Sequence, residues 1–175
     1  EMIGYGITSG GFANTTLRIG PGITEIGDYA FSNPRFDKIY LPNTLEKIEI
    51  GAFEKCAFST IHIPPSVKYI GSNAFAENDY LTSVTGMKGV TTIKSTPFNE
   101  TKIDFIEIWK PLSEIDYESN WNGYGGSQFN MFYGTRLNKD EDNDNTNLYE
   151  ELYEATLKRE YYFKVLEKYT GTKLE

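Results

Sequence analysis

Cysteine and histidine are nearly absent from this chain of 175 residues, where each occurs once, as Cys56 and His62. A single cysteine excludes an intrachain disulfide framework and a zinc site built on several cysteines. A single histidine leaves little material for a histidine-rich metal site or for a Ser-His-Asp triad. Long hydrophobic runs are also missing, since no stretch approaches about 18 apolar residues. We therefore expect no membrane-spanning helix and no insertion into a bilayer.

Positive charge is scarce as well. The 17 Lys and Arg residues are outnumbered by 25 Asp and Glu residues, which gives a formal net charge of −8. Because phosphate backbones are bound by clustered Lys and Arg, we expect no nucleic-acid partner. Aromatic residues are plentiful by contrast, at 15% of the chain, and so much apolar mass excludes an intrinsically disordered protein.

An internal repeat of 22 or 23 residues runs through the first two thirds of the chain. Apolar residues recur in fixed register over four units. The columns are Phe31, Phe53, Phe75 and Phe98; Ile26, Ile48, Ile70 and Ile93; and Ile23, Leu45, Val67 and Val90. One such unit cannot bury its own apolar face, but stacked units bury a continuous column. The repeat therefore predicts a solenoid in which each Phe lies over the Phe of the next coil.

Each unit also carries the alternating pattern of a half-buried strand, as in Ile39-x-Leu41 and Ile61-x-Ile63. Pro42 and Pro64 follow these stretches, where a residue without an N–H marks the end of a strand. The residues between the buried ones should point outward, and they fall into two rows. The first row is Arg18, Tyr40, His62, Thr85 and Glu107, and the second is Thr16, Lys38, Thr60, Ser83 and Phe105.

The repeated residues resemble the BspA-like leucine-rich repeat over about residues 15–115. The segments that carry the resemblance are Ile23-Thr-Glu-Ile26-Gly27-Asp-Tyr-Ala30-Phe31, Phe58-Ser-Thr-Ile61-His-Ile63-Pro64 and Val67-Lys-Tyr-Ile70-Gly71-Ser-Asn-Ala74-Phe75. The resemblance implies a β-rich leucine-rich-repeat solenoid, curved, with a parallel sheet on its concave face. With a C-terminal helix the chain would be α+β overall. The fourth copy departs from the pattern at Thr96-Pro97 and at Gly86, which predicts a distorted coil and an interrupted strand.

The resemblance also implies a cell-surface or secreted bacterial protein with a role in adhesion. We expect a non-enzymatic binding module that recognises a protein or a glycan through the concave sheet, without cofactor or metal. The expected partner-binding residues are Arg18, Tyr40, His62, Thr85, Glu107, Lys38 and Phe105. A purely structural repeat segment of a longer surface protein is the alternative. A glycan-acting enzyme around Trp121, with Glu118 or Asp116, is a remote one. Cys56 is expected to be a packed thiol and not a nucleophile.

The composition changes after the solenoid, which we assign to residues 1–117. Residues 118–146 combine large aromatic residues with glycines and then an acidic stretch, and every solenoid end needs a cover. We expect a cap there, and a carbohydrate-stacking platform is the alternative. Asp140, Asp142, Asp144 and Glu151 have the spacing of a calcium loop, but Asn145 and Asn147 stand at positions that should be glycine and apolar. An acidic connector is therefore preferred over a calcium site.

Residues 147–171 are predicted to form an amphipathic helix. Asn147 and Glu150 fit a capping box, and Gly171 fits the left-handed residue that ends many helices. Apolar residues follow a 4-3 spacing with Arg159 in the middle: Leu148, Leu152, Ala155, Tyr162, Leu166 and Tyr169. This seam could pair two chains in a coiled coil. Docking of the helix on the flank or end of its own solenoid is the preferred interpretation.

Overall fold

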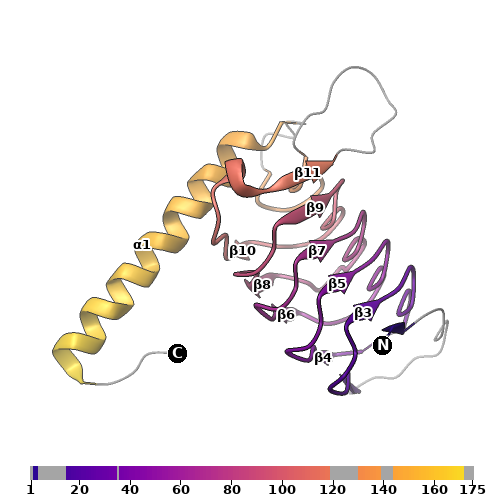
Figure 1. Cartoon of the computed structure of the whole chain (residues 1–175). Helices are drawn as coiled ribbons and strands as arrows, with labels where there is room; N and C mark the ends of the chain where they lie inside the picture. The colour runs from indigo at the N-terminus through magenta and orange to yellow at the C-terminus, as the bar shows by residue number, and fades with distance from the viewer. Residues whose placement is uncertain (1, 4–14, 35, 119–129, 139–143, 172–175) are drawn as a thin grey trace.

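The computed structural model describes residues 2–3, 15–34, 36–118, 130–138 and 144–171. These residues form a stack of coils followed by one long helix (Figure 1). The strands are β1 (Met2–Ile3), β2 (Thr16–Arg18), β3 (Glu25–Ile26), β4 (Lys38–Tyr40), β5 (Lys47–Ile48), β6 (Thr60–Ile63), β7 (Tyr69–Ile70), β8 (Ser83–Gly86), β9 (Thr92–Lys94), β10 (Phe105–Ile106) and β11 (Asp116–Glu118). A 3-10 helix spans Leu112–Glu114, and α1 spans Thr146–Thr170. The predicted leucine-rich-repeat solenoid with a C-terminal helix is confirmed.

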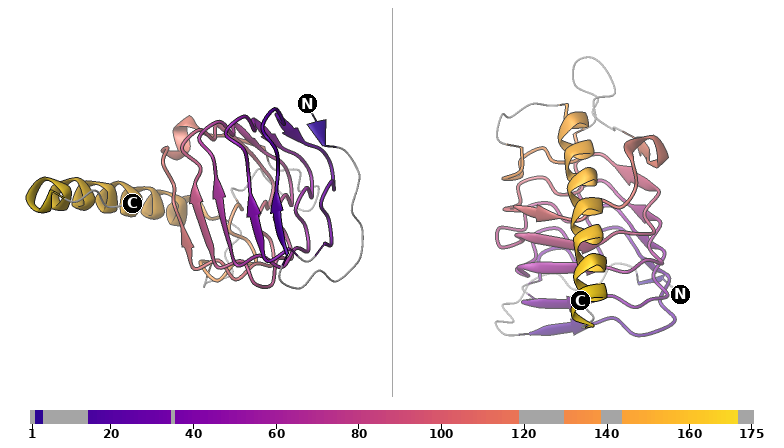
Figure 2. Two further views of the ribbon diagram at one scale, coloured as in Figure 1. Left: turned by 90° about the horizontal axis from the view of Figure 1, so that it is seen from below. Right: turned by 90° about the vertical axis from the view of Figure 1, so that its left-hand side faces the viewer.

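The coils carry two sets of parallel strands that face each other across the core (Figure 2). One set is a six-stranded sheet in the order β1-β3-β5-β7-β9-β11. The other set contains the sheets β2-β4 and β6-β8-β10, with β4 beside β6. The repeat predicted only the second set. Most strands of the six-stranded sheet are two residues long, too short to show an alternating pattern.

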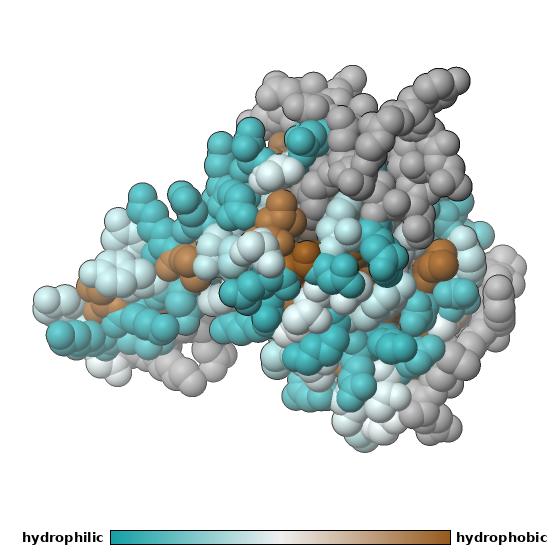
Figure 3. Space-filling model, turned by 45° about the horizontal axis from the view of Figure 1, so that its top comes forward, coloured by the Kyte–Doolittle hydropathy of each residue, from teal (hydrophilic) through white to brown (hydrophobic). Residues whose placement is uncertain are grey.

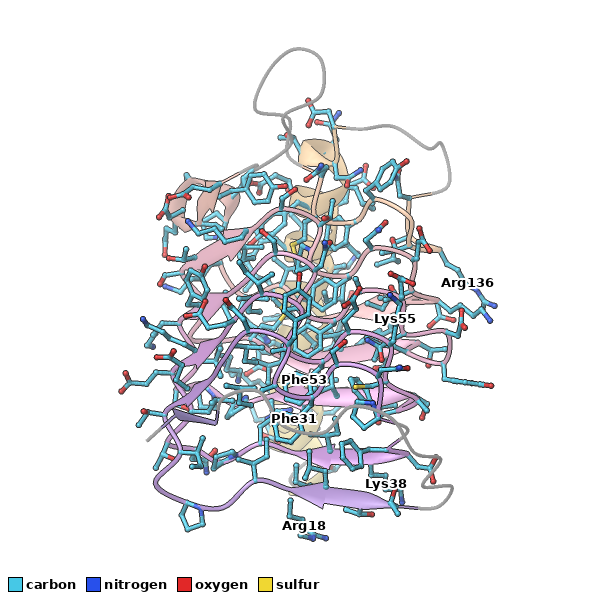
Figure 4. The ribbon with its side chains drawn as sticks, turned by 90° about the vertical axis from the view of Figure 1, so that its right-hand side faces the viewer. Arg18, Phe31, Lys38, Phe53, Lys55 and Arg136 are labelled. Carbon is cyan, nitrogen blue, oxygen red and sulfur yellow. The ribbon has the colours of Figure 1, made fainter. Side chains whose placement is uncertain are left out.

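The core is built from repeated side chains stacked along the solenoid axis. Phe31, Phe53, Phe75 and Phe98 stack with near-parallel rings, their centroids 5.5, 5.6 and 5.5 Å apart. Figure 4 shows Phe31 and Phe53 between the two sets of strands. Each column residue covers its equivalent in the coil before it, so no coil has a core of its own. The predicted phenylalanine column is confirmed.

Four successive coils turn through two residues in left-handed backbone conformation, four positions apart. The columns are Tyr29, Gly51, Asn73 and Thr96, and Asn33, Lys55, Glu77 and Glu100. This conformation is unfavourable for most residues that carry a Cβ atom. The turns are held by hydrogen bonds between coils: the Asn33 N–H donates to the Glu54 carbonyl at 2.8 Å, and the Lys55 N–H donates to the Ala76 carbonyl at 3.0 Å. The stacking of coils therefore fixes the turns.

Gly86 ends β8 and does not interrupt it, so the predicted interruption is wrong. Gly86 pairs in register with Ile63 and has a φ of +87°. A Cβ atom at this position would lie 2.0 Å from the Ile63 carbonyl oxygen, which only glycine avoids. The close approach lets the fourth coil keep its pairing with the third.

The C-terminal part of the chain covers the last coil. Met131 and Phe132 are fully buried in the same core as the phenylalanine column. The predicted capping box is wrong, because Glu150 accepts a hydrogen bond from the Leu112 N–H at 2.9 Å and not from its own helix. Gly171 is left-handed, as expected, and its N–H donates to the Glu167 carbonyl at 2.9 Å.

Only the first half of α1 lies on the solenoid. Tyr149 and Thr156 are buried against the last coil. The second half extends away from the coils, as Figure 2 shows, and its Tyr161, Tyr162 and Tyr169 side chains are 65%, 54% and 80% exposed. The predicted docking on the end of the solenoid is therefore correct for one half of the helix.

Candidate functional site

The outward rows of the sequence are neighbours in the structure. Register pairs Thr16 with Lys38, Arg18 with Tyr40, Thr60 with Ser83, His62 with Thr85, and Phe105 with Ser83. We call this surface the paired rows: Thr16, Arg18, Lys38, Tyr40, Thr60, His62, Ser83, Thr85 and Phe105. A side chain on one strand lies about 4.8 Å from its equivalent on the next. The paired rows therefore form one continuous strip across five coils.

A cation lies over an aromatic ring near each end of the paired rows. The Arg18 guanidinium is 4.1 Å from the centroid of the Tyr40 ring, and the Arg159 guanidinium is 5.1 Å from the centroid of Phe105. Tyr40 is 47% exposed and Phe105 is 38% exposed. Arg18 and Lys38 lie at the N-terminal end of the stack (Figure 4). Arginine and exposed aromatic residues are enriched at protein interfaces.

His62 occupies the middle of the strip. Its Nδ1 atom lies 3.0 Å from the Thr85 hydroxyl oxygen, within hydrogen-bond distance. The contact joins β6 to β8 and orients the imidazole along the surface. No carboxylate or thiol makes a hydrogen bond with this histidine among the described residues, which gives it no partner for acid–base catalysis there.

Glu107 does not belong to the outward row, so its predicted exposure is wrong. It is 8% exposed. Its Oε2 atom accepts hydrogen bonds from the Gly86 N–H at 2.7 Å and from the Trp109 indole N–H at 3.3 Å. Its Oε1 atom accepts one from the Arg159 guanidinium of α1. Glu107 therefore links the last coil to α1, and the exposed part of the paired rows ends at Phe105.

The contact between Glu107 and Arg159 was missed by sequence reasoning. Arg159 stands in the middle of an otherwise apolar seam, and this irregularity was the available signal. A long basic side chain in such a place needs a carboxylate to face it. The sequence could not say which of 25 acidic residues that would be.

The remaining candidate sites are only partly within the described residues. The Cys56 thiol is buried, lies 3.2 Å from the Phe31 carbonyl oxygen as a weak donor, and has a pKa raised by burial. Trp121, Asp140 and Asp142 lie outside the described residues. Asp144 lies within them and accepts hydrogen bonds from the Thr146 N–H at 3.0 Å and from the Thr146 hydroxyl at 2.6 Å. No three His, Cys, Asp or Glu side chains gather as metal ligands in the described part of the chain.

The opposite sheet carries charges of both signs. Lys94 pairs with Glu118 at 2.5 Å and lies 5.8 Å from the centroid of the Tyr69 ring. The pKa of the Glu49 carboxyl is raised, mainly because burial disfavours its charged form and further because Glu25 lies near it.

The face of the molecule in Figure 3 is mostly hydrophilic, with separate hydrophobic patches. Within the described ranges, no helix is both long and apolar enough to cross a membrane.

Comparison with known proteins identifies the repeat. The family model described as "BspA type Leucine rich repeat region" matches residues 6–124 with six copies. A search of curated proteins found no match. Among solved structures, the chain is similar to a leucine-rich repeat protein from Bacteroides ovatus, with 19% sequence identity and a TM-score of 0.34, over 70% of this chain and 41% of that one. The match to the family model covers well over half of the sequence, and the chain belongs to the BspA-type leucine-rich repeat family.

Proposed function

We propose that this chain is a non-enzymatic, adhesin-like binding module of a bacterial cell-surface protein, and that it holds a protein partner on the paired rows. Members of this repeat family are typically non-enzymatic interaction modules. The proposal rests mainly on the exposed Arg18–Tyr40 pair. It combines a cation with an aromatic surface at the N-terminal end of the strip.

The chemistry of the strip favours a partner with carboxylates and apolar side chains. Arg18, Lys38 and His62 supply donors, and Tyr40 and Phe105 supply apolar area. Glu107, the carboxylate that the strand alternation assigned to the strip, is buried and already paired with Arg159. The strip is therefore basic and aromatic, although the whole chain has a net charge of −8.

The test is binding of the full chain to a panel of extracellular-matrix proteins on a surface. The variant combines Arg18→Ser, Tyr40→Ser and His62→Ser. The matched control combines Lys47→Ser, Tyr69→Ser and Thr92→Ser, which removes a similar set of side chains from the outward side of β5, β7 and β9. We expect the first variant to lose at least tenfold in affinity and the control to bind like the parent chain.

Equal loss in the two variants would contradict the proposal, and so would unchanged binding in the first. Unchanged thermal unfolding of both variants is required, and we expect it, because the substituted side chains point away from the core. If no protein on the panel binds, the purely structural role in a longer surface protein gains support instead.

A further inference from the structure

A groove crosses the turns that directly follow β5, β7 and β9. Its volume is about 360 Å³. It spans three successive coils and is also lined by Tyr133, from the segment that covers the last coil. The lining residues are Ile50, Ser72, Asn73, Ser95, Thr96, Asn99 and Tyr133.

The lining of this groove is uncharged and exposes polar and apolar atoms in similar amounts. None of its seven residues is Asp, Glu, Lys or Arg, in a chain where these types make up 24% of the sequence. An anionic ligand would need Lys or Arg in the lining, and a lipid would need an apolar one. Hydroxyl and carboxamide side chains offer both donors and acceptors. They match a ligand whose own groups donate and accept, as alcohol hydroxyls do.

The repeat sets these polar groups at regular intervals along the groove. Ser72 and Ser95 are equivalent positions of successive coils, and so are Asn73 and Thr96. The Thr96 hydroxyl donates to Asn73 Oδ1 at 2.8 Å, which joins two of these groups into a ladder. With coils about 4.8 Å apart, the ladder presents a polar group at each step. Successive hydroxyls of a sugar chain are spaced for such a ladder.

Aromatic and aliphatic surface borders the ladder. Tyr133 lines one end and Ile50 the other. Beside Ile50, the Tyr29 ring covers Gly51 so closely that a Cβ atom there would lie 2.4 Å from the ring. Tyr29 is 40% exposed. Aromatic faces are favourable contacts for the C–H faces of sugar rings, and the tyrosine hydroxyls add a polar edge.

One observation marks the groove as more than a gap between turns. Asn99 lines the groove, and its Oδ1 atom is buried and accepts no hydrogen bond from any residue that the structure describes. This acceptor thus has no partner within the described protein, and a ligand hydroxyl that reached it would supply one.

We propose that this groove binds an uncharged saccharide, with Asn73, Thr96 and Asn99 bonding its hydroxyls and Tyr133 packing against a sugar ring. The groove and the paired rows share no residue and come from different parts of each coil. It is therefore independent of the proposed protein partner.

The test is an array of uncharged oligosaccharides built from glucose, galactose, mannose and N-acetylglucosamine, with sulfated and sialylated counterparts. Saccharides that bind are then titrated against the full chain by NMR. We expect binding of uncharged members, and at least a tenfold weaker affinity in Tyr133→Ala and in Thr96→Gly. Glycine adopts the left-handed conformation without strain, which offsets the lost hydrogen bond from the Thr96 hydroxyl to Asn73, so Thr96→Gly should melt close to the parent chain.

The matched control is Glu100→Gly. It makes the same backbone change at a left-handed residue, with a φ of +54°, that does not line the groove. It should bind saccharide like the parent chain, and so should the Arg18, Tyr40 and His62 triple variant. Binding of charged glycans only, no saccharide binding at millimolar concentration, or undiminished binding in Tyr133→Ala and Thr96→Gly would each overturn the proposal.

Discussion

The carboxylate of Glu107 and the guanidinium of Arg159 form an ion pair, although 52 residues separate them in the chain. The pair joins the last coil of the solenoid to α1. Two further donors to Glu107, the Gly86 N–H and the Trp109 indole N–H, tie the same carboxylate to the fourth coil and to the segment after β10. One buried carboxylate thus connects three parts of the fold.

Arg159→Ala should therefore destabilise the chain. It leaves Glu107 mostly buried without its cation, and a charged hydrogen-bond partner contributes about 1.5–3 kcal/mol. The cost is measured as the free energy of unfolding in urea. Lys158→Ala, the exposed neighbour on the same helix, is the control and should change stability very little. If the two substitutions cost the same, the ion pair does not anchor the helix.

Phe53→Ala tests the phenylalanine column. Phe53 is fully buried, and its ring stacks on those of Phe31 and Phe75. The substitution should lower the free energy of unfolding by about 3–5 kcal/mol, the range for deleting a core aromatic. Tyr80→Ala removes a ring that is 62% exposed and serves as the control. A Phe53→Ala chain that melted like the parent would show that the coils do not share one core.

Glu49→Gln tests the charge on the six-stranded sheet. Because the pKa of Glu49 is raised in the folded chain, its ionised form opposes folding, and stability is lost as pH rises through that pKa. Glu49→Gln should therefore raise the melting temperature at pH 7. Near pH 3.5, which is below the ordinary carboxyl pKa of 4.5, this gain in melting temperature should vanish. Glu46→Gln, at an exposed position, controls for the loss of one negative charge. A gain of equal size at both pH values would rule out this explanation.

The sequence predicted the parts of this fold that are repeated. The column of Phe31 to Phe98 and the strands around Ile39 and Ile61 recur with the coil, so four copies of the same signal were available. The six-stranded sheet was missed because its strands are too short to show a period. The buried position of Glu107 was missed for another reason. Its surroundings come from a helix that is distant in sequence and occurs once.

The two candidate sites also differ in how far the sequence predicted them. The paired rows were visible because strand alternation places Arg18 beside Tyr40 and His62 beside Thr85. The groove was not visible, because its polar ladder lies in the turns. There Ser72, Asn73 and Thr96 look like ordinary turn residues. Together with Tyr133, which comes from outside the repeat, these turn residues line one groove.

Two truncations test the docked and the projecting halves of α1 separately. The docked half forms hydrogen bonds with backbone groups of the last coil. Ile108 occupies the same position in its coil as Ile19. The Ile19 N–H donates to the Tyr40 carbonyl of the following coil at 3.1 Å, whereas the Ile108 N–H donates to the Thr156 hydroxyl of α1 at 3.0 Å. The Tyr149 hydroxyl likewise donates to the Lys110 carbonyl at 3.1 Å. The helix thus satisfies backbone groups that a further coil would otherwise satisfy.

A chain that ends after Asp116 should consequently aggregate or fail to fold. It loses Met131 and Phe132 from the core, and it leaves the edge of the last coil open to pair with another chain. A chain that ends after Glu160 should stay soluble and melt within a few degrees of the parent, because Tyr161, Tyr162, Leu166 and Tyr169 are all exposed. Size-exclusion chromatography and thermal unfolding measure both outcomes. If the shorter chain stayed monomeric and melted like the parent, α1 would not be part of the cover. If the longer chain aggregated, the projecting half of α1 would have a role in the stability of the solenoid that its exposure does not predict.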